Sequence, residues 1–204
     1  MRNSFKATIA AVAMFAMSGL ASAGVITSTV VGSPVNPAGF GSFSGTANAF
    51  WTSYASLMTN GWRGVLSIDG PGTVQYTTLG KEAGYSNSLL IPGGTQSPLF
   101  DNTFGVSSFQ TYLAASQLQF TFSTVNPLSS VSNGNTSNST PQFAIFNGGT
   151  SGYQYFLAYN DKGGDYDWDD MIVGVKVTAV PEPGTLALLG IRLAGLGFAR
   201  RRKV

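Results

Sequence analysis

The chain has 204 residues, of which 26 are Gly and 9 are Pro; 10% are charged, 43% are hydrophobic, and it contains neither Cys nor His. Without imidazole or thiol groups there can be no Ser-His-Asp or Cys-His nucleophile pair, no zinc thiolate cluster and no disulfide. Any metal site therefore has to use oxygen ligands.

The formal net charge of +2 is unevenly distributed along the chain. Lys and Arg gather at the two ends, whereas residues 24–179 contain four basic and eight acidic side chains, a net charge of −4. Nucleic-acid binding needs basic residues clustered on the folded domain. We therefore expect no nucleic-acid partner.

The first 23 residues have the organisation of a signal peptide. A basic start and an apolar run are followed by Ala21, Ser22 and Ala23, the small-x-small pattern that signal peptidase cleaves. A retained membrane anchor is the less favoured alternative, because the apolar run is short and ends at this pattern. We expect cleavage before Gly24 and export of the protein.

Residues 24–179 are predicted to form one mostly β domain. Apolar and polar residues alternate over 117–123 and 171–178, which is the pattern of half-buried strands. Further strands are expected at 25–31, 64–68, 73–79, 88–91, 142–146 and 153–159. Gly-rich and Pro-rich turns separate these segments. The pattern favours an antiparallel, jelly-roll-like β-sandwich.

Two segments of this domain depart from the strand pattern. Aromatic and apolar residues recur at helical spacing over 47–59, which predicts one amphipathic helix packed at an edge or end of the sandwich. The aromatic side chains of this helix are expected in the core rather than on a sugar-stacking surface. The run 129–140 is polar and low in complexity, and is expected to be a mobile surface loop.

Five of the domain's eight acidic residues lie within ten positions. They are Asp161, Asp165, Asp167, Asp169 and Asp170. Like charges this close repel unless a cation or protons neutralise them, and alternating Asp residues in a Gly-started loop bring several oxygens to one Ca²⁺. We therefore treat all five as candidate ligands of calcium or another hard cation.

This acidic segment fits the EF-hand pattern only in part. Asp170 stands at the position of the EF-hand glycine, and Lys176 at that of the final glutamate. An alternative reading is an exposed turn in which the carboxylates cap backbone amides, with Tyr166 and Trp168 packed onto the sandwich. The sequence favours neither reading over the other.

The last 25 residues combine three features in a fixed order. Pro181, Glu182 and Pro183 hold the backbone extended, which presents the glutamate to an enzyme's cleft. A mostly apolar stretch over 186–199 can enter a bilayer as a helix. Four adjacent cations would hold its end on the cytoplasmic side: Arg200, Arg201, Arg202 and Lys203.

This C-terminal segment resembles the PEP-CTERM sorting signal of Gram-negative bacteria that make extracellular polysaccharide. The resemblance implies that an exosortase, a membrane enzyme similar to transpeptidases, processes the Pro181-Glu182-Pro183 site. The acidic segment also resembles a Gly-Asp-x-Asp-aromatic-Asp/Asn-Asp motif found in such secreted proteins. Arg192 departs from the family pattern, which has an apolar residue at this position. An Arg at the centre of a membrane helix costs about 2.5–3.5 kcal/mol. We therefore expect only a weak or transient inner-membrane association.

These observations predict a non-enzymatic exported protein, without catalytic residues, located at the cell surface or in the extracellular matrix. Exosortase would sort it, exopolysaccharide or biofilm would be its partner, and calcium would stabilise it. The alternative is a carbohydrate-binding module that stacks glycan on exposed Trp62, Tyr85 or Trp168. A less favoured alternative is a secreted hydrolase that uses a pair of carboxylates.

Overall fold

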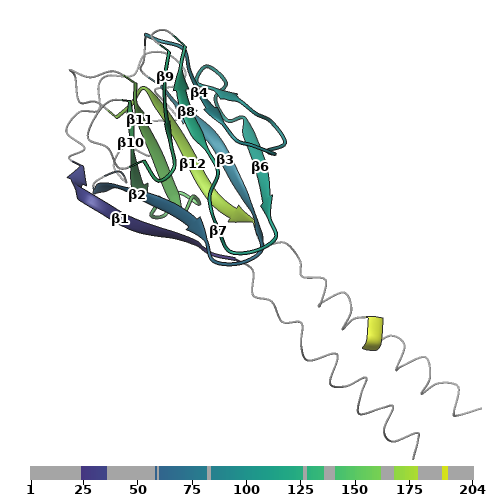
Figure 1. The fold of residues 1–204 in the computed structure, drawn as a ribbon. Helices are drawn as coiled ribbons and strands as arrows, with labels where there is room; N and C mark the ends of the chain where they lie inside the picture. The colour runs from purple at the N-terminus through teal and green to yellow at the C-terminus, as the bar shows by residue number, and fades with distance from the viewer. Residues whose placement is uncertain are drawn as a thin grey trace, which may run out of the picture. The chain divides into compact units, whose positions relative to one another are not determined.

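The computed structural model describes residues 24–35, 58, 60–81, 84–125, 128–135, 141–161, 168–178 and 190–192. Gly24–Thr178 forms one compact unit. All twelve strands of the described residues lie in this unit (Figure 1).

The larger of two antiparallel sheets contains eight strands. Their order is β1-β2-β10-β11-β12-β3-β6, and β7 pairs with β2 beside this path. The strands are β1 (Ile26–Val35), β2 (Gly61–Ile68), β3 (Gly72–Gly80), β6 (Ser107–Tyr112), β7 (Ser116–Gln117), β10 (Gln142–Asn147), β11 (Tyr155–Asn160) and β12 (Met171–Thr178). Strands β10, β11 and β12 follow one another as antiparallel neighbours at its centre.

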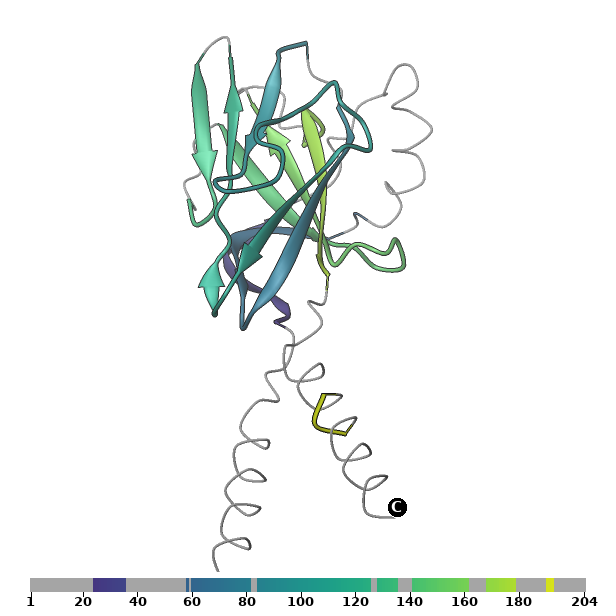
Figure 2. The same cartoon turned by 90° about the vertical axis from the view of Figure 1, so that its right-hand side faces the viewer.

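The smaller sheet has four short strands in the order β5-β4-β8-β9 (Figure 2). They are β4 (Asn87–Leu90), β5 (Leu99–Phe100), β8 (Thr121–Thr124) and β9 (Ser129–Ser132). All of its strand pairs are antiparallel. The prediction of a mostly β fold with antiparallel sheets is confirmed, whereas the jelly-roll-like sandwich stays a prediction.

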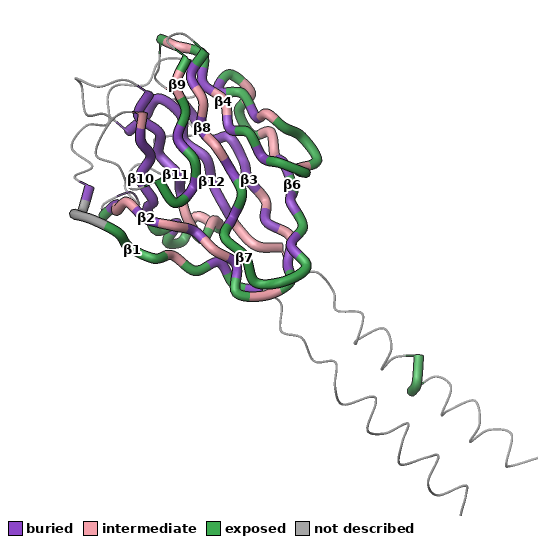
Figure 3. Tube along the Cα trace, viewed as in Figure 1, coloured by how far each residue is buried: buried purple, intermediate pink, exposed green. Residues whose placement is uncertain are grey.

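Side chains from both sheets meet in one buried cluster. Phe122 of the smaller sheet stacks on Tyr159 of the larger one, with ring centroids 4.8 Å apart and planes 7° from parallel. Phe120 meets Phe143 edge-on at 5.5 Å. Such ring pairs contribute about 0.5–1.5 kcal/mol each beyond the area they bury. Figure 3 shows the buried positions concentrated on the central strands.

A second buried cluster lies on the opposite face of the central strands. On β11, Leu157 belongs to the shared core, while its neighbours Phe156 and Ala158 belong to the second cluster. Because successive side chains of a strand point to opposite faces, β11 is buried on both sides. Ile172 of β12 is also fully buried in the second cluster. The expected half-buried alternation over 171–178 is therefore wrong for the first half of that strand.

The predicted loop over 129–140 is also wrong in its first part. Residues Ser129–Ser132 form β9, and Val131 at its centre is buried in the shared core. Asn133 is buried directly after this strand and binds the backbone of β2 and of Leu118. The polar sequence predicts a loop, but pairing with β8, burial of Val131 and the hydrogen bonds of Asn133 attach the segment to the domain. Residues 136–140 lie outside the described part.

Several other predictions fall on residues that are not described. These are the signal peptide with Ala21 and Ala23, and the predicted helix over 47–59 except for Met58, which is buried in the second cluster. The tail is described only at 190–192, a short exposed helical turn. Within the described ranges, no helix is long and apolar enough to cross a membrane.

Candidate functional site

Two adjacent strands bring the ends of the acidic segment together. Asp161 directly follows β11, and Asp169 and Asp170 directly precede β12, its antiparallel neighbour. All three are buried, with exposed fractions of 5%, 0% and 7%. The two remaining candidate ligands, Asp165 and Asp167, lie outside the described residues. The described ends of this segment are therefore buried and not an exposed turn.

Asn87 of the smaller sheet connects both ends of the segment. Its fully buried amide Nδ2 donates to Asp161 Oδ2 at 2.7 Å and to the carbonyl oxygen of Asp170 at 3.3 Å. The backbone N–H of Asp161 in turn donates to Asp170 Oδ2 at 2.7 Å. Thr124 Oγ1 donates to Asn87 Oδ1 at 2.8 Å. One amide thus fixes a carboxylate and holds the two sheets together at this point.

A further buried carboxylate, that of Asp101, binds the backbone of Asn87. Its Oδ2 accepts the Asn87 N–H at 2.7 Å and the Lys81 ammonium at 3.2 Å. This is the only ion pair between two described residues. Lys81 thus compensates the charge of Asp101, whereas the donors described here for Asp161 and Asp170 are amides.

Tyr159 borders this cluster with a phenol that stays protonated. Its hydroxyl shares a hydrogen bond of 2.8 Å with Thr124 Oγ1. Burial raises the pKa of Tyr159 to about 12; the hydrogen bond to Thr124 lowers it, and the negative charges of Asp161 and Asp170 raise it. The hydroxyl therefore serves as a neutral hydrogen-bonding group at physiological pH.

The chemistry of the cluster suits a hard cation, although the described residues alone do not complete a site. Carboxylate and carbonyl oxygens are the ligands that Ca²⁺ takes, and buried carboxylates need compensation. Within the described ranges, no group of three or more acidic side chains is arranged to hold a metal ion. A complete ligand set would have to draw on Asp165 or Asp167 as well.

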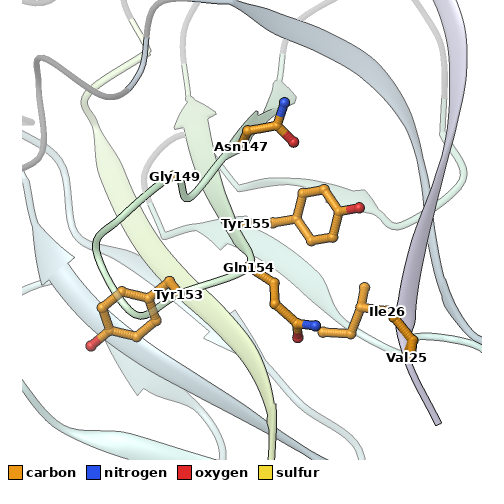
Figure 4. A pocket seen from close by; sticks show the side chains of 7 residues that line it. All are labelled: Val25, Ile26, Asn147, Gly149, Tyr153, Gln154 and Tyr155. Carbon is orange, nitrogen blue, oxygen red and sulfur yellow. The ribbon is translucent and has the colours of Figure 1, made fainter.

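A separate hollow of about 490 Å³ lies where β1 passes the turn between β10 and β11. Its lining residues are Val25, Ile26, Asn147, Gly149, Tyr153, Gln154 and Tyr155. Figure 4 shows Tyr155 and Asn147 on the side facing β1, while the ring of Tyr153 extends away from them. The lining contains no carboxylate and no cation, so it lacks the acid pair that glycoside hydrolysis uses.

The aromatic residues proposed for sugar stacking are less exposed than that role requires. Trp168 is 4% exposed and packs in the second buried cluster. Trp62 is half-buried against the shared core, with its ring edge-on to Tyr155 at 6.4 Å. Tyr85 is also half-buried. Trp168 therefore cannot form an exposed sugar-stacking surface. The carbohydrate-binding alternative is wrong in naming this residue.

Sequence reasoning missed Asn87 and Asp101 as members of the cluster. Asn87 precedes the acidic segment by more than 70 residues and begins a four-residue strand. Asp101 directly follows the two-residue strand β5. No local pattern distinguishes them from surface polar residues. Only the pairing of β4 with β5, and the packing of β4 against the β11–β12 end, brings them to the aspartates.

Comparison with known proteins gives one match. Residues 179–203 match the family model described as the PEP-CTERM protein-sorting motif. No curated protein and no solved structure matches the chain. The matched range contains Pro181, Glu182 and Pro183 as well as the basic residues 200–203. The chain therefore carries a PEP-CTERM sorting motif, which makes it an exported, surface-associated protein that an exosortase sorts.

Proposed function

We propose that this chain is a non-enzymatic protein of the cell surface or extracellular matrix that associates with exopolysaccharide in a biofilm. The observation that carries the proposal is the sorting motif at 179–203, which follows a compact β unit, Gly24–Thr178. The absence of His and Cys removes the commonest nucleophile pairs. Asp101 pairs with Lys81 and binds a backbone amide, which suits a structural role.

Calcium is proposed as a structural cofactor of this unit. Asp161, Asp169 and Asp170 are buried, and together with Asp165 and Asp167 they place five carboxylates within ten positions. A bound cation would offset the repulsion among these charges and stabilise the junction of the two sheets. The ligands would come from these five residues, while Asn87 would hold Asp161 in position.

Sorting is tested in cells that make the full chain with and without an exosortase. We expect the parent protein to lose its tail and leave the inner-membrane fraction only when the enzyme is present. Glu182→Gln removes the charge of the sorting motif and should leave the tail attached. Glu82→Gln changes the only other glutamate of the chain and should be processed normally. Equal processing of the parent and Glu182→Gln would contradict the assignment.

Calcium binding is tested by calorimetry and thermal unfolding of the purified full chain, in chelator and with added Ca²⁺. A ligand at 100 times its Kd stabilises by about 2.7 kcal/mol, which corresponds to about 5–10 °C for a unit of this size. Asp169→Asn should abolish the shift, whereas Asp69→Asn, in a distant turn, should preserve it. Equal melting temperatures of the parent with chelator and with Ca²⁺ would refute the cofactor.

A carbohydrate-binding module is the second candidate function. Its support is a surface on β12, β3 and β6 of the larger sheet, which differs from the surface that the Trp residues suggested. A secreted hydrolase has less support, because every described carboxylate except that of Asp69 lies buried in one cluster, and the hollow beside β1 has none in its lining. Turnover of a polysaccharide that is lost on Asp169→Asn would bring the hydrolase forward.

A further inference from the structure

Three neighbouring strands carry mostly polar side chains on the side away from the shared core. We call this side the polar face; it comprises Thr73, Gln75 and Thr77 of β3, Ser107, Phe109 and Thr111 of β6, and Lys176 and Thr178 of β12. Thr77 is buried, Phe109 and Thr111 are exposed, and the others are half-buried. The pairing of β12 with β3 and of β3 with β6 aligns these residues in rows across the strands. The alternate residues Val74, Tyr76 and Val175 point into the shared core.

Side-chain hydrogen bonds hold this face in one arrangement. Gln75 Nε2 donates to Ser107 Oγ at 2.9 Å and to Thr77 Oγ1 at 3.1 Å. The hydroxyls of Thr77 and Ser107 are 2.8 Å apart, and those of Thr73 and Thr111 are 3.1 Å apart. A ligand that binds here would order few side chains, which lowers the entropic cost of association.

Aromatic rings lie at both sides of the polar face. Phe109, in the row of Lys176 and Gln75, is 38% exposed on the outer strand β6. On the other side, the ring of Tyr153 covers the backbone of Gly174, where an added Cβ would lie only 2.6 Å from the ring. A strand spacing of about 4.8 Å places β12 and β6 roughly 10 Å apart.

The polar face carries one cation, Lys176, which favours a ligand of negative charge. Lys176 Nζ lies 5.6 Å from the centre of the Tyr153 ring, so the ring holds the ammonium beside the row of Gln75. The only ion pair between described residues is the distant one of Lys81. The polar face itself contains no carboxylate. Its electrostatic complement is therefore an anionic group.

We propose that the polar face binds an extended anionic polysaccharide that contains uronic acid units. Hydroxyl and amide groups match sugar hydroxyls, aromatic rings pack on the apolar faces of pyranose rings, and Lys176 binds a sugar carboxylate. A chain that crosses the strands meets Tyr153, Lys176, Gln75 and Phe109 in turn. The proposal rests on the exopolysaccharide association above and locates it on the protein.

The test measures binding of the full chain, purified in mild detergent, to polyuronate oligosaccharides by titration calorimetry, with neutral dextran as the comparison. We expect polyuronate to bind and dextran to bind about two- to fivefold more weakly, because Lys176 is the one cation of the polar face. Lys176→Gln should weaken polyuronate binding about two- to fivefold, in line with an exposed ion pair. Phe109→Ala should weaken it about tenfold, in line with one lost ring contact.

Matched variants separate a binding role from a folding role. Lys176→Arg keeps the charge and should retain affinity. Arg63→Gln removes one cation from β2, three strands away from β12, and should also retain it. All variants should melt within a few degrees of the parent.

Different failures have different meanings. Polyuronate binding that is unchanged in both Lys176→Gln and Phe109→Ala would overturn the site while leaving the exopolysaccharide association standing. Equal affinity for dextran and polyuronate would overturn the anionic ligand class. If neither glycan binds, and the protein also fails to associate with the matrix of its own cells, both the site and the proposed function fall.

Discussion

Replacing Asn87 by Ala should be among the most destabilising single changes in the domain. The substitution removes the donor to the buried Asp161 carboxylate and the acceptor of the Thr124 hydroxyl. A hydrogen bond to a charged group contributes about 1.5–3 kcal/mol, and a buried polar group that loses its partner costs about 1–3 kcal/mol. We therefore expect a loss of about 3–5 kcal/mol, a large part of a typical stability of 5–15 kcal/mol.

The assay is urea and thermal unfolding of Asn87→Ala beside Ser88→Ala, its neighbour in β4. The expected loss corresponds to a fall in Tm of about 6–20 °C, whereas Ser88→Ala should stay near the parent. Much of the cost should come from the lost hydrogen bond between the Asn87 amide and the buried Asp161 carboxylate. In an Asp161→Asn background the same substitution should therefore cost markedly less. A loss below 1 kcal/mol, or an equal loss in both backgrounds, would refute the reasoning.

Three further changes test other parts of the structure. Asn133→Ala breaks three hydrogen bonds to the backbone of β2 and of the segment before β8, and should cost about 2–4 kcal/mol in urea unfolding. Gly174→Ala should displace the Tyr153 ring from its position beside Lys176, cost about 1–3 kcal/mol and weaken polyuronate binding in calorimetry. The contribution of Tyr159 to the free energy of unfolding should be constant below pH 10 and fall between pH 10 and about 12, because unfolded tyrosine ionises before Tyr159 with its raised pKa. Tyr159→Phe should reduce the loss of stability over this pH range in urea unfolding.

Local pattern predicts the positions of most strands, but it missed β5, β6 and β9, and it did not predict the assignment of strands to sheets. Leu118, Phe120 and Phe122 are buried as their alternation predicts. Nevertheless, β7 just before this run pairs in the larger sheet, while β8 within it pairs in the smaller one. Period-2 alternation reports which side chains face a core, and it carries no information about the partner strand.

Burial on both faces was equally hidden from the sequence. Ile172 alternates with Met171 and Val173, so the run reads as half-buried, yet all three are fully buried. The second cluster, which includes Val35 and Met58, covers Ile172 from distant parts of the chain. Local sequence cannot show such a cover, because it arises from long-range packing.

The acidic cluster was predictable from composition, and its surroundings were not. Aspartates that lie this close in the sequence repel one another unless a cation or protons neutralise them. The group that holds Asp161 is Asn87, and a polar residue at the start of a short strand has no local feature that indicates such a role. The polar face was missed for a similar reason, since its Thr, Ser and Gln residues come together only through the register of β12, β3 and β6.

The most direct test of the central claim is the location of the protein in its own cells before and after enzymatic digestion of the extracellular polysaccharide. Cells, matrix and medium would be separated and the protein quantified in each. We predict that it is held in the matrix and is released into the medium when the polysaccharide is digested. A protein that remains in the cell fraction, or that is already free in the medium before digestion, would contradict an exopolysaccharide-associated function.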